Sequence, residues 1–225
     1  MTDIVQNAPI TSNLAQAKNK VLRNTYGLLA LSLLPTVAGA WLGVASGIHL
    51  SGLVGLLIFL AGAYGFMFAI EKNKDSSLGV GLLLAFTFFM GFMLSGLIAR
   101  TLHFSNGPAL IMTAFGGTAG VFLAMAVLAN TIKRDLSGFG NFLAVGALAL
   151  FVGSIVNVFV GSTAFMMAIS VLAIGIFSGF MLFELKRVVD GGETNYVSAT
   201  LSIYLSAYNV FQSLLSLLGV VGGED

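Results

Sequence analysis

Small polar side chains recur at regular intervals in the last hydrophobic segment of the sequence, residues 196–220. From Ser202 onward the intervals are 4, 3, 4 and 3 residues, which places one polar stripe along one helix face. The stripe consists of Ser202, Ser206, Asn209, Ser213 and Ser216. Hydroxyl and amide groups facing lipid would lack partners, at a cost of about 1–3 kcal/mol each. We therefore expect this helix to lie inside a bundle, where its polar face could line a path for protons or ions.

A second interpretation of the stripe needs no polar path. Serine hydroxyls in a helix can donate to the carbonyl groups of their own preceding turn, and then they require no partner elsewhere. Asn209 is harder to satisfy in this way than the serines.

Glu184 is the acid that lies nearest to the interior of a hydrophobic segment, and two bases follow it closely. It is either a charge at the membrane surface, paired with a neighbouring base, or a carboxylate that gates or lines a polar path beside the last helix. Asn157 could line the same path, or it could hydrogen-bond between helices. The candidates for proton-sensing or pore-lining residues are therefore Glu184, Ser206, Asn209 and Asn157.

The sequence contains no recognisable catalytic constellation. Intramembrane serine proteolysis needs a serine and a histidine at matching depth, but His49 and His103 fall in breaks between hydrophobic segments. An aspartyl protease needs two acids inside the membrane, whereas Asp75, Asp135 and Asp190 fall in loops. The chain has no cysteine, and two histidines on separate loops make a weak metal site. We expect a protein that is not an enzyme and that has no cofactor and no metal site.

Composition indicates which elements must position these residues. Hydrophobic residues make up 57% of the 225 residues and charged residues only 8%, against about 25% charged in soluble domains. A membrane span needs roughly 20 apolar residues. The sequence therefore predicts an all-α membrane protein with seven transmembrane helices and the last helix central, and the predicted spans are 24–45, 50–70, 77–99, 108–131, 139–160, 164–185 and 196–220.

The distribution of basic residues predicts the orientation. With a cytoplasmic amino terminus, only Arg100 of the ten lysines and arginines falls on the outer side, as the positive-inside rule requires. We therefore expect residues 1–23 to form a polar cytoplasmic tail, residues 24–221 a seven-helix domain, and residues 222–225 a short outer tail.

Glycine pairs four residues apart are frequent in the hydrophobic segments. Such spacings allow the backbones of membrane helices to approach closely. We expect them to pack within one molecule rather than to form a dimer face, and the pairs are Gly39/Gly43, Gly43/Gly47, Gly116/Gly120 and Gly175/Gly179.

A longer pattern surrounds the polar stripe and resembles the carboxyl-terminal signature of the Bax inhibitor-1 family. It consists of residues 191–197 (GGETNYV), 199–201 (ATL), 204–205 (YL), 208–211 (YNVF) and 214–219 (LLSLLG). Two further stretches, 21–26 (VLRNTY) and 116–119 (GGTA), resemble the proteobacterial YccA branch of that family.

The resemblance implies a seven-helix bundle with a central last helix and two possible activities. Members of the YccA branch modulate the membrane-anchored AAA protease FtsH, which implies an inner-membrane protein of a bacterium with such a protease complex as its partner. Other members are pH-sensitive calcium leak channels, in which two aspartates on the sixth and seventh helices share a proton. Those positions fall on Glu184 and Ser206 here, so the second acid is missing and a proton-coupled carboxylate pair cannot form. We expect the protease modulator, with the calcium or cation leak channel as the alternative.

Overall fold

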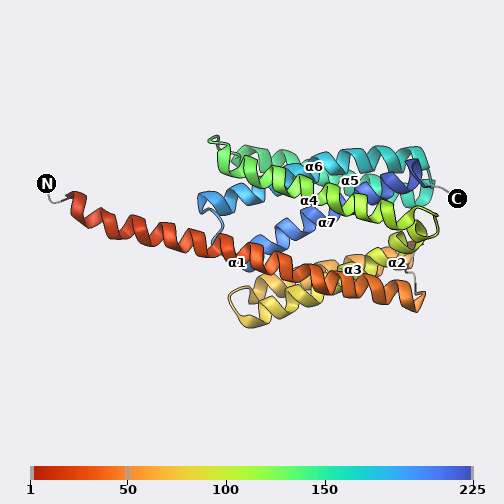
Figure 1. The fold of residues 1–225 in the computed structure, drawn as a ribbon, viewed down its shortest axis with the longest axis horizontal. Coiled ribbons are helices and arrows are strands. Elements are labelled where there is room, and N and C mark those ends of the chain that lie inside the picture. The colour runs from red at the N-terminus through yellow and green to blue at the C-terminus, as the bar shows by residue number, and fades with distance from the viewer. Residues whose placement is uncertain (1–2, 49, 51, 224–225) are drawn as a thin grey trace.

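The computed structural model describes residues 3–48, 50 and 52–223, and the side chains of residues 3–18 and Ser137 are outside that description. Within this part the chain forms seven helices and no strand, which confirms the all-α prediction. The helices are α1 Asp3–Ser46, α2 Gly52–Asn73, α3 Ser77–Leu102, α4 Gly107–Thr131, α5 Ser137–Val160, α6 Thr163–Asp190 and α7 Tyr196–Val221 (Figure 1). Two predicted features, His49 and the outer tail beyond Gly223, lie outside the described residues.

All seven helices contain a stretch long and apolar enough to cross a membrane, so the protein is a multi-pass membrane protein. Most predicted spans match the helices within a few residues. At α1 the candidate span is Asn19–Ser46, close to the predicted 24–45, and the helix itself extends further back to Asp3. Residues 10–24 contain neither glycine nor proline and several good helix formers, so nothing in this sequence interrupts the helix.

Short turns join the helices, as the narrow polar breaks predict. The break between residues 160 and 163 is the least obvious in the sequence. There Gly161 adopts a left-handed conformation with φ +66° that ends α5, a common use of glycine after a helix. The hydroxyl of Ser162 then accepts a hydrogen bond from Phe165 N and caps α6.

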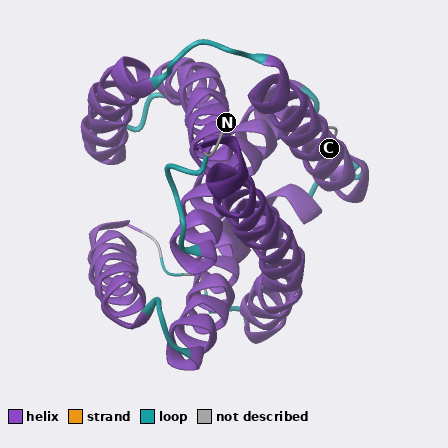
Figure 2. Ribbon diagram, turned by 90° about the vertical axis from the view of Figure 1, so that its left-hand side faces the viewer, coloured by secondary structure: helices purple, strands orange, loops and turns teal. Residues whose placement is uncertain are grey.

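The turns α2–α3, α4–α5 and α6–α7 lie together at one end of the bundle (Figure 1). We call it the basic end because it carries Lys72, Lys74, Lys133, Arg134, Lys186 and Arg187. The other end, where α7 finishes, is the opposite end. Figure 2 looks along the bundle from the basic end and shows loops crossing between neighbouring helices there.

Helix α7 occupies the middle of the bundle, as the polar stripe predicts. It packs against α1, α2, α3, α4 and α6, whereas α5 packs mainly against α6 on the outside. One side of α7 meets α3, where Phe86 and Tyr204 place their rings 6.2 Å apart edge to face. Another side meets α6 through Met181, Leu185 and Ile203. Because lipid is as apolar as these side chains, close packing rather than removal from water stabilises these contacts.

The glycine pairs divide into packed and open ones. A Cβ on Gly39 would clash with the Phe88 carbonyl oxygen, and one on Gly43 would clash with the Ser95 side chain. The prediction of packing within the molecule is therefore correct where α1 crosses α3. It is wrong for Gly116/Gly120 on α4, where a Cβ would meet no atom within 4 Å. The spacing in Gly39/Gly43 equals that in Gly116/Gly120. The first pair faces α3, whereas within the described part of the chain the second faces no other helix.

The two remaining pairs are each half packed. A Cβ on Gly179 would lie 2.8 Å from Leu143, while one on Gly175 would meet nothing within 4 Å. Gly47 is likewise open and has φ +66°, since it ends α1 rather than packing.

Candidate functional site

Glu184 lies near the basic end of α6 and is paired with a base. Its residue is only 8% exposed, and its Oε2 accepts a hydrogen bond of 3.1 Å from Arg187 Nη1. Arg187 also donates to Glu193 Oε2 at 3.3 Å. The pairing with a neighbouring base agrees with the first of the two interpretations, but the carboxylate is buried.

Asn195 joins this ion pair to a loop far away in the sequence. Its Oδ1 accepts from the backbone N–H groups of Val197 and Ser198 at 2.9 and 3.1 Å, which caps α7. Its Nδ2 donates to Asp75 Oδ1 at 2.8 Å and to the Lys74 carbonyl at 3.2 Å. Glu193 Oε1 accepts from the Asn195 backbone N–H at 2.9 Å. We call Glu184, Arg187, Glu193, Asn195 and Asp75 the basic-end network.

Two further ion pairs lie at the same end. Lys186 Nζ donates to Asp190 Oδ1 at 2.8 Å, and Lys74 Nζ donates to Glu71 Oε2 at 2.9 Å. The hydrogen bond that the Lys74 ammonium group donates to Glu71 raises its pKa. Glu71, Glu184, Asp190 and Glu193 are therefore engaged with bases, and Asp75 is bonded to the Asn195 amide.

The two candidate residues in the middle of α7 bond to their own helix. Ser206 Oγ donates to the Ser202 carbonyl at 3.1 Å, and Asn209 Nδ2 donates to the Leu205 carbonyl at 2.8 Å. The Asn209 amide N–H thus reaches the carbonyl four residues earlier, while no hydrogen bond within the described residues engages its Oδ1. Within the described residues no hydrogen bond joins Ser206 to Glu184. Ser206 bonds to the Ser202 carbonyl, and Glu184 bonds to Arg187.

The opposite half of the bundle contains a polar cavity of about 600 Å³ between α2, α3, α5, α6 and α7. It brings together two of the four candidates, Asn157 and Asn209, which come from helices that have little other contact. Asn157 Oδ1 accepts from Ser162 N at 3.1 Å, so its Nδ2 group remains as a donor. The polar side chains that line the cavity are Arg100, Ser154, Asn157, Ser170, Tyr208, Asn209, Gln212, Ser213 and Ser216.

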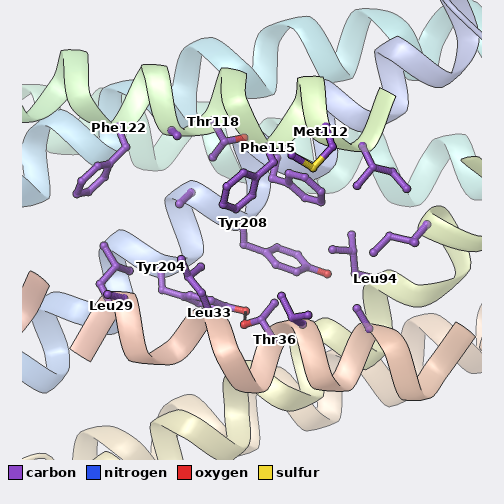
Figure 3. Close-up of a pocket in the computed structure, with 18 of the residues that line it drawn as sticks. Leu29, Leu33, Thr36, Leu94, Met112, Phe115, Thr118, Phe122, Tyr204 and Tyr208 are labelled. Atoms are coloured by element: carbon purple, nitrogen blue, oxygen red, sulfur yellow. Dashed lines mark hydrogen bonds between the residues drawn. The ribbon is translucent and has the colours of Figure 1, made fainter. Parts of the chain in front are cut away.

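A second hollow, an apolar groove of about 720 Å³, lies between α1, α3, α4 and α7. Figure 3 shows Leu29 and Leu33 of α1 on one side and Met112, Phe115 and Phe122 of α4 on the other. On its floor Tyr204 Oη and Thr36 Oγ1 are 2.9 Å apart and share a hydrogen bond. The groove has the character of a lipid-facing surface, and its walls offer little polar chemistry.

Tyr208 and Leu94 line both hollows and so form the wall between them. The Tyr208 hydroxyl donates to the Met90 carbonyl at 3.2 Å, which fixes the ring against α3 (Figure 3). With this wall in place, the polar cavity and the apolar groove are separate compartments.

Two residues that the structure makes prominent, Arg100 and Asn195, are not among the candidates predicted from the sequence. Arg100 contributes the only charge to the lining of the polar cavity within the described residues. Its isolation on the outer side was visible in the sequence and could have marked it. Asn195 precedes a hydrophobic run, which is the usual signal of a helix cap, but its bond to Asp75 depends on tertiary structure.

The described residues contain no group of three or more His, Cys, Asp or Glu side chains that could hold a metal ion. His103, the histidine within that part, is exposed just after α3.

Known proteins similar to this chain match it over nearly the whole bundle. Residues 18–223 match the family model described as inhibitor of apoptosis-promoting Bax1. The chain is 41% identical over 207 residues to an uncharacterised membrane protein of Vibrio cholerae, with 92% of each chain covered. It is 40% identical over 201 residues to the modulator of FtsH protease YccA of Escherichia coli K12, covering 89% of this chain and 90% of that one. The same values hold for the inner membrane protein YccA of Escherichia coli O6:H1.

Proposed function

The chain belongs to the Bax inhibitor-1 family, and from that premise we propose that it is a non-enzymatic protein that binds and modulates a membrane-anchored AAA protease of the FtsH kind. The observation that carries the proposal is the 40% identity, over 201 residues, to a protein named as a modulator of FtsH protease. The aligned region extends over nearly the whole bundle rather than over one motif.

The proposed location is the inner membrane of a bacterium, with the amino terminus in the cytoplasm. A relative that is 40% identical is named as an inner membrane protein. The orientation is supported by the bases, since six of them gather at the basic end and Arg100 lies at the other end. A reporter active only in the cytoplasm, fused after Asp225, should give no signal, and a strong signal would contradict this orientation.

The amino-terminal part of α1 is the segment that a protease of this kind could engage. It projects beyond the other helices at the basic end (Figure 1), and residues 3–18 correspond to about 24 Å at 1.5 Å per residue. A single helix without neighbours is marginally stable in water. Its unfolding would therefore oppose an unfolding protease little, whereas the packed bundle behind it would resist.

The proposal is tested by removing residues 2–17 and keeping a tag at the carboxyl end. Capture from native membranes should recover the protease with the full-length protein. The shortened protein should fold normally but persist longer in cells with active protease, because its end is too short to be gripped. In cells depleted of the protease, both proteins should have the same lifetime. Failure to recover the protease with the full-length protein would contradict the proposal, and equal turnover in cells with active protease would contradict the role of the tail.

The alternative, a pH-sensitive calcium or cation leak, is supported by the polar cavity, which gathers Asn157 and Asn209 around α7. Two observations weigh against it. Glu184 is paired with Arg187 instead of facing a second acid, and the charge that lines the cavity belongs to Arg100, which repels cations.

A further inference from the structure

The charged side chain in the lining of the polar cavity is positive. Among the described residues that line it there is one base, Arg100, and no acid. Within residues 3–48 and 52–223 no carboxylate forms an ion pair with the Arg100 guanidinium group. Gln212, Asn209 and Asn157 add amide groups to the same lining. A positive charge surrounded by further N–H and O–H donors favours an anion over a cation.

Two buried hydroxyl groups in the cavity have spare hydrogen-bonding capacity. Ser170 is 6% exposed and Ser213 is 9% exposed, and both line the cavity. In the described part of the chain no hydrogen bond engages either hydroxyl, in contrast to Ser154, which donates to the Leu150 carbonyl at 2.8 Å. These two hydroxyls, on α6 and α7, line the cavity and are placed to bond a molecule that enters it.

The remaining walls are apolar and the space is large. Phe59, Phe151, Phe177 and Ile169 line the cavity alongside the polar groups. Its volume of about 600 Å³ is within the usual range of organic ligand sites, roughly 300–1,000 Å³. An inorganic anion would leave most of this space unfilled, whereas an organic anion could use the donors and the apolar walls together.

We propose that the polar cavity binds an organic anion, a carboxylate or phosphate attached to an apolar body, with Arg100 holding the anionic group. Arg100 is exposed at the end of α3, so the anion can approach from the aqueous face of the opposite end. The apolar body then lies among the phenylalanine side chains, and Ser170 and Ser213 donate to oxygen atoms of the ligand. The chemistry is shared by a water-soluble acid and by the headgroup of an anionic lipid, and the experiment separates these two sources.

The test is a titration of the full-length protein, held in nanodiscs of phosphatidylcholine, with 4-fluorobenzoate observed by ¹⁹F NMR. Saturable binding is expected for 4-fluorobenzoate and not for its neutral and cationic counterparts, 4-fluorobenzyl alcohol and 4-fluorobenzylamine. Arg100→Gln should raise the Kd about tenfold or more, because a charge-assisted hydrogen bond is lost. Arg100→Lys should retain part of the affinity, and Ser213→Ala should have a smaller effect than Arg100→Gln.

Arg134→Gln is the matched control, since it removes one positive charge from the basic end and does not touch the cavity. It should leave the Kd unchanged. The proposal is overturned if 4-fluorobenzoate shows no saturable binding, if the alcohol binds as tightly, or if Arg100→Gln and Arg134→Gln have equal effects. Binding that appears only after Glu224→Gln and Asp225→Asn would also overturn it, because the acidic end of the chain itself would then occupy Arg100.

The source of the anion follows from repeating the titration in nanodiscs that contain phosphatidylglycerol. If this lipid competes with 4-fluorobenzoate and the competition is lost in Arg100→Gln, an anionic lipid headgroup is the ligand. If the lipid does not compete, the site takes water-soluble organic anions. Both results support the anion site, and neither depends on whether the protease proposal holds.

Discussion

The two ends of the bundle use their polar side chains in opposite ways. At the basic end the carboxylates, bases and Asn195 bond to one another across the α2–α3 and α6–α7 turns. At the opposite end Arg100, Ser170 and Ser213 surround a cavity without bonding to one another. The first arrangement joins distant turns and stabilises the fold. The second leaves donors available, so the opposite end is where a ligand can gain the most from binding.

This contrast also holds within a single helix. Helix α7 begins in the network and ends beside the cavity, with Asn195 at its start and Ser213 near its far end. Substitutions at the basic end should therefore change stability, and substitutions at the opposite end should change binding.

The largest effect is expected for Asn195→Ala. The change removes the cap of α7 and both bonds to the α2–α3 turn, so the free energy of unfolding should fall by about 2 kcal/mol. Unfolding by SDS in mixed micelles measures this value. Asn130→Ala is the control, because Asn130 is exposed and bonds only within its helix, to the Ala126 carbonyl. Equal losses in both variants would show that the network does not join the two turns.

A smaller loss is expected for Arg187→Gln. Glu184 would remain buried without its partner, and because the Arg187 side chain is 40% exposed the loss should be only about 1 kcal/mol. Glu184→Gln in the same chain should restore part of the stability, since the uncompensated charge is then removed. A double-mutant cycle measures the coupling. If the two losses simply add, the pair does not contribute to the stability of the basic end.

Almost no loss of stability is expected for Arg100→Gln. Arg100 has no ion-pair partner among the described residues, and changes at exposed positions without partners usually stay within about 0.5 kcal/mol. The same SDS titration checks this. A loss as large as that of Arg187→Gln would mean that Arg100 holds the bundle together, and the contrast between the two ends would disappear.

The helices could be predicted from the sequence because lipid imposes a strict length and composition on each span. The polar stripe also predicted that α7 lies in the middle, because polar side chains that face lipid would lack hydrogen-bond partners. The four candidate residues were chosen by the same local logic, and the structure brings only Asn157 and Asn209 to one cavity.

The remaining features depend on contacts between distant segments. Nothing near Asn195 in the sequence reveals that Asp75 lies beside it. The glycine spacing is identical in a packed pair and an open pair, because it defines a helix face but not the neighbour of that face. Arg100 lines a cavity only because α5 and α7, which are distant from it in the sequence, also contribute to the walls.

The smallest effect is expected where the two ends would have to communicate. A leak would require a continuous polar path from Glu184, near the basic end, to the cavity at the opposite end. Ser206 lies between them on α7 and bonds to its own helix. We therefore expect little or no calcium flux through the protein reconstituted in liposomes. The flux is measured from about pH 5 to about pH 8, because carboxylates with raised pKa values titrate in roughly this range.

Ser206→Asp makes this expectation sharper. The substitution supplies a second carboxylate on α7, and two nearby carboxylates in a medium of low effective dielectric share a proton near neutral pH. If Glu184 and residue 206 face a common path, calcium flux in Ser206→Asp should become pH-dependent, and adding Glu184→Gln should abolish that dependence. If Glu184 stays bound to Arg187, as its 3.1 Å hydrogen bond indicates, Ser206→Asp should only lower stability, because it buries a charge at a position that is 4% exposed. We expect the second result. Strong, pH-dependent flux through the unmodified protein that persists in Glu184→Gln would contradict both the separation of the two ends and the choice of Glu184.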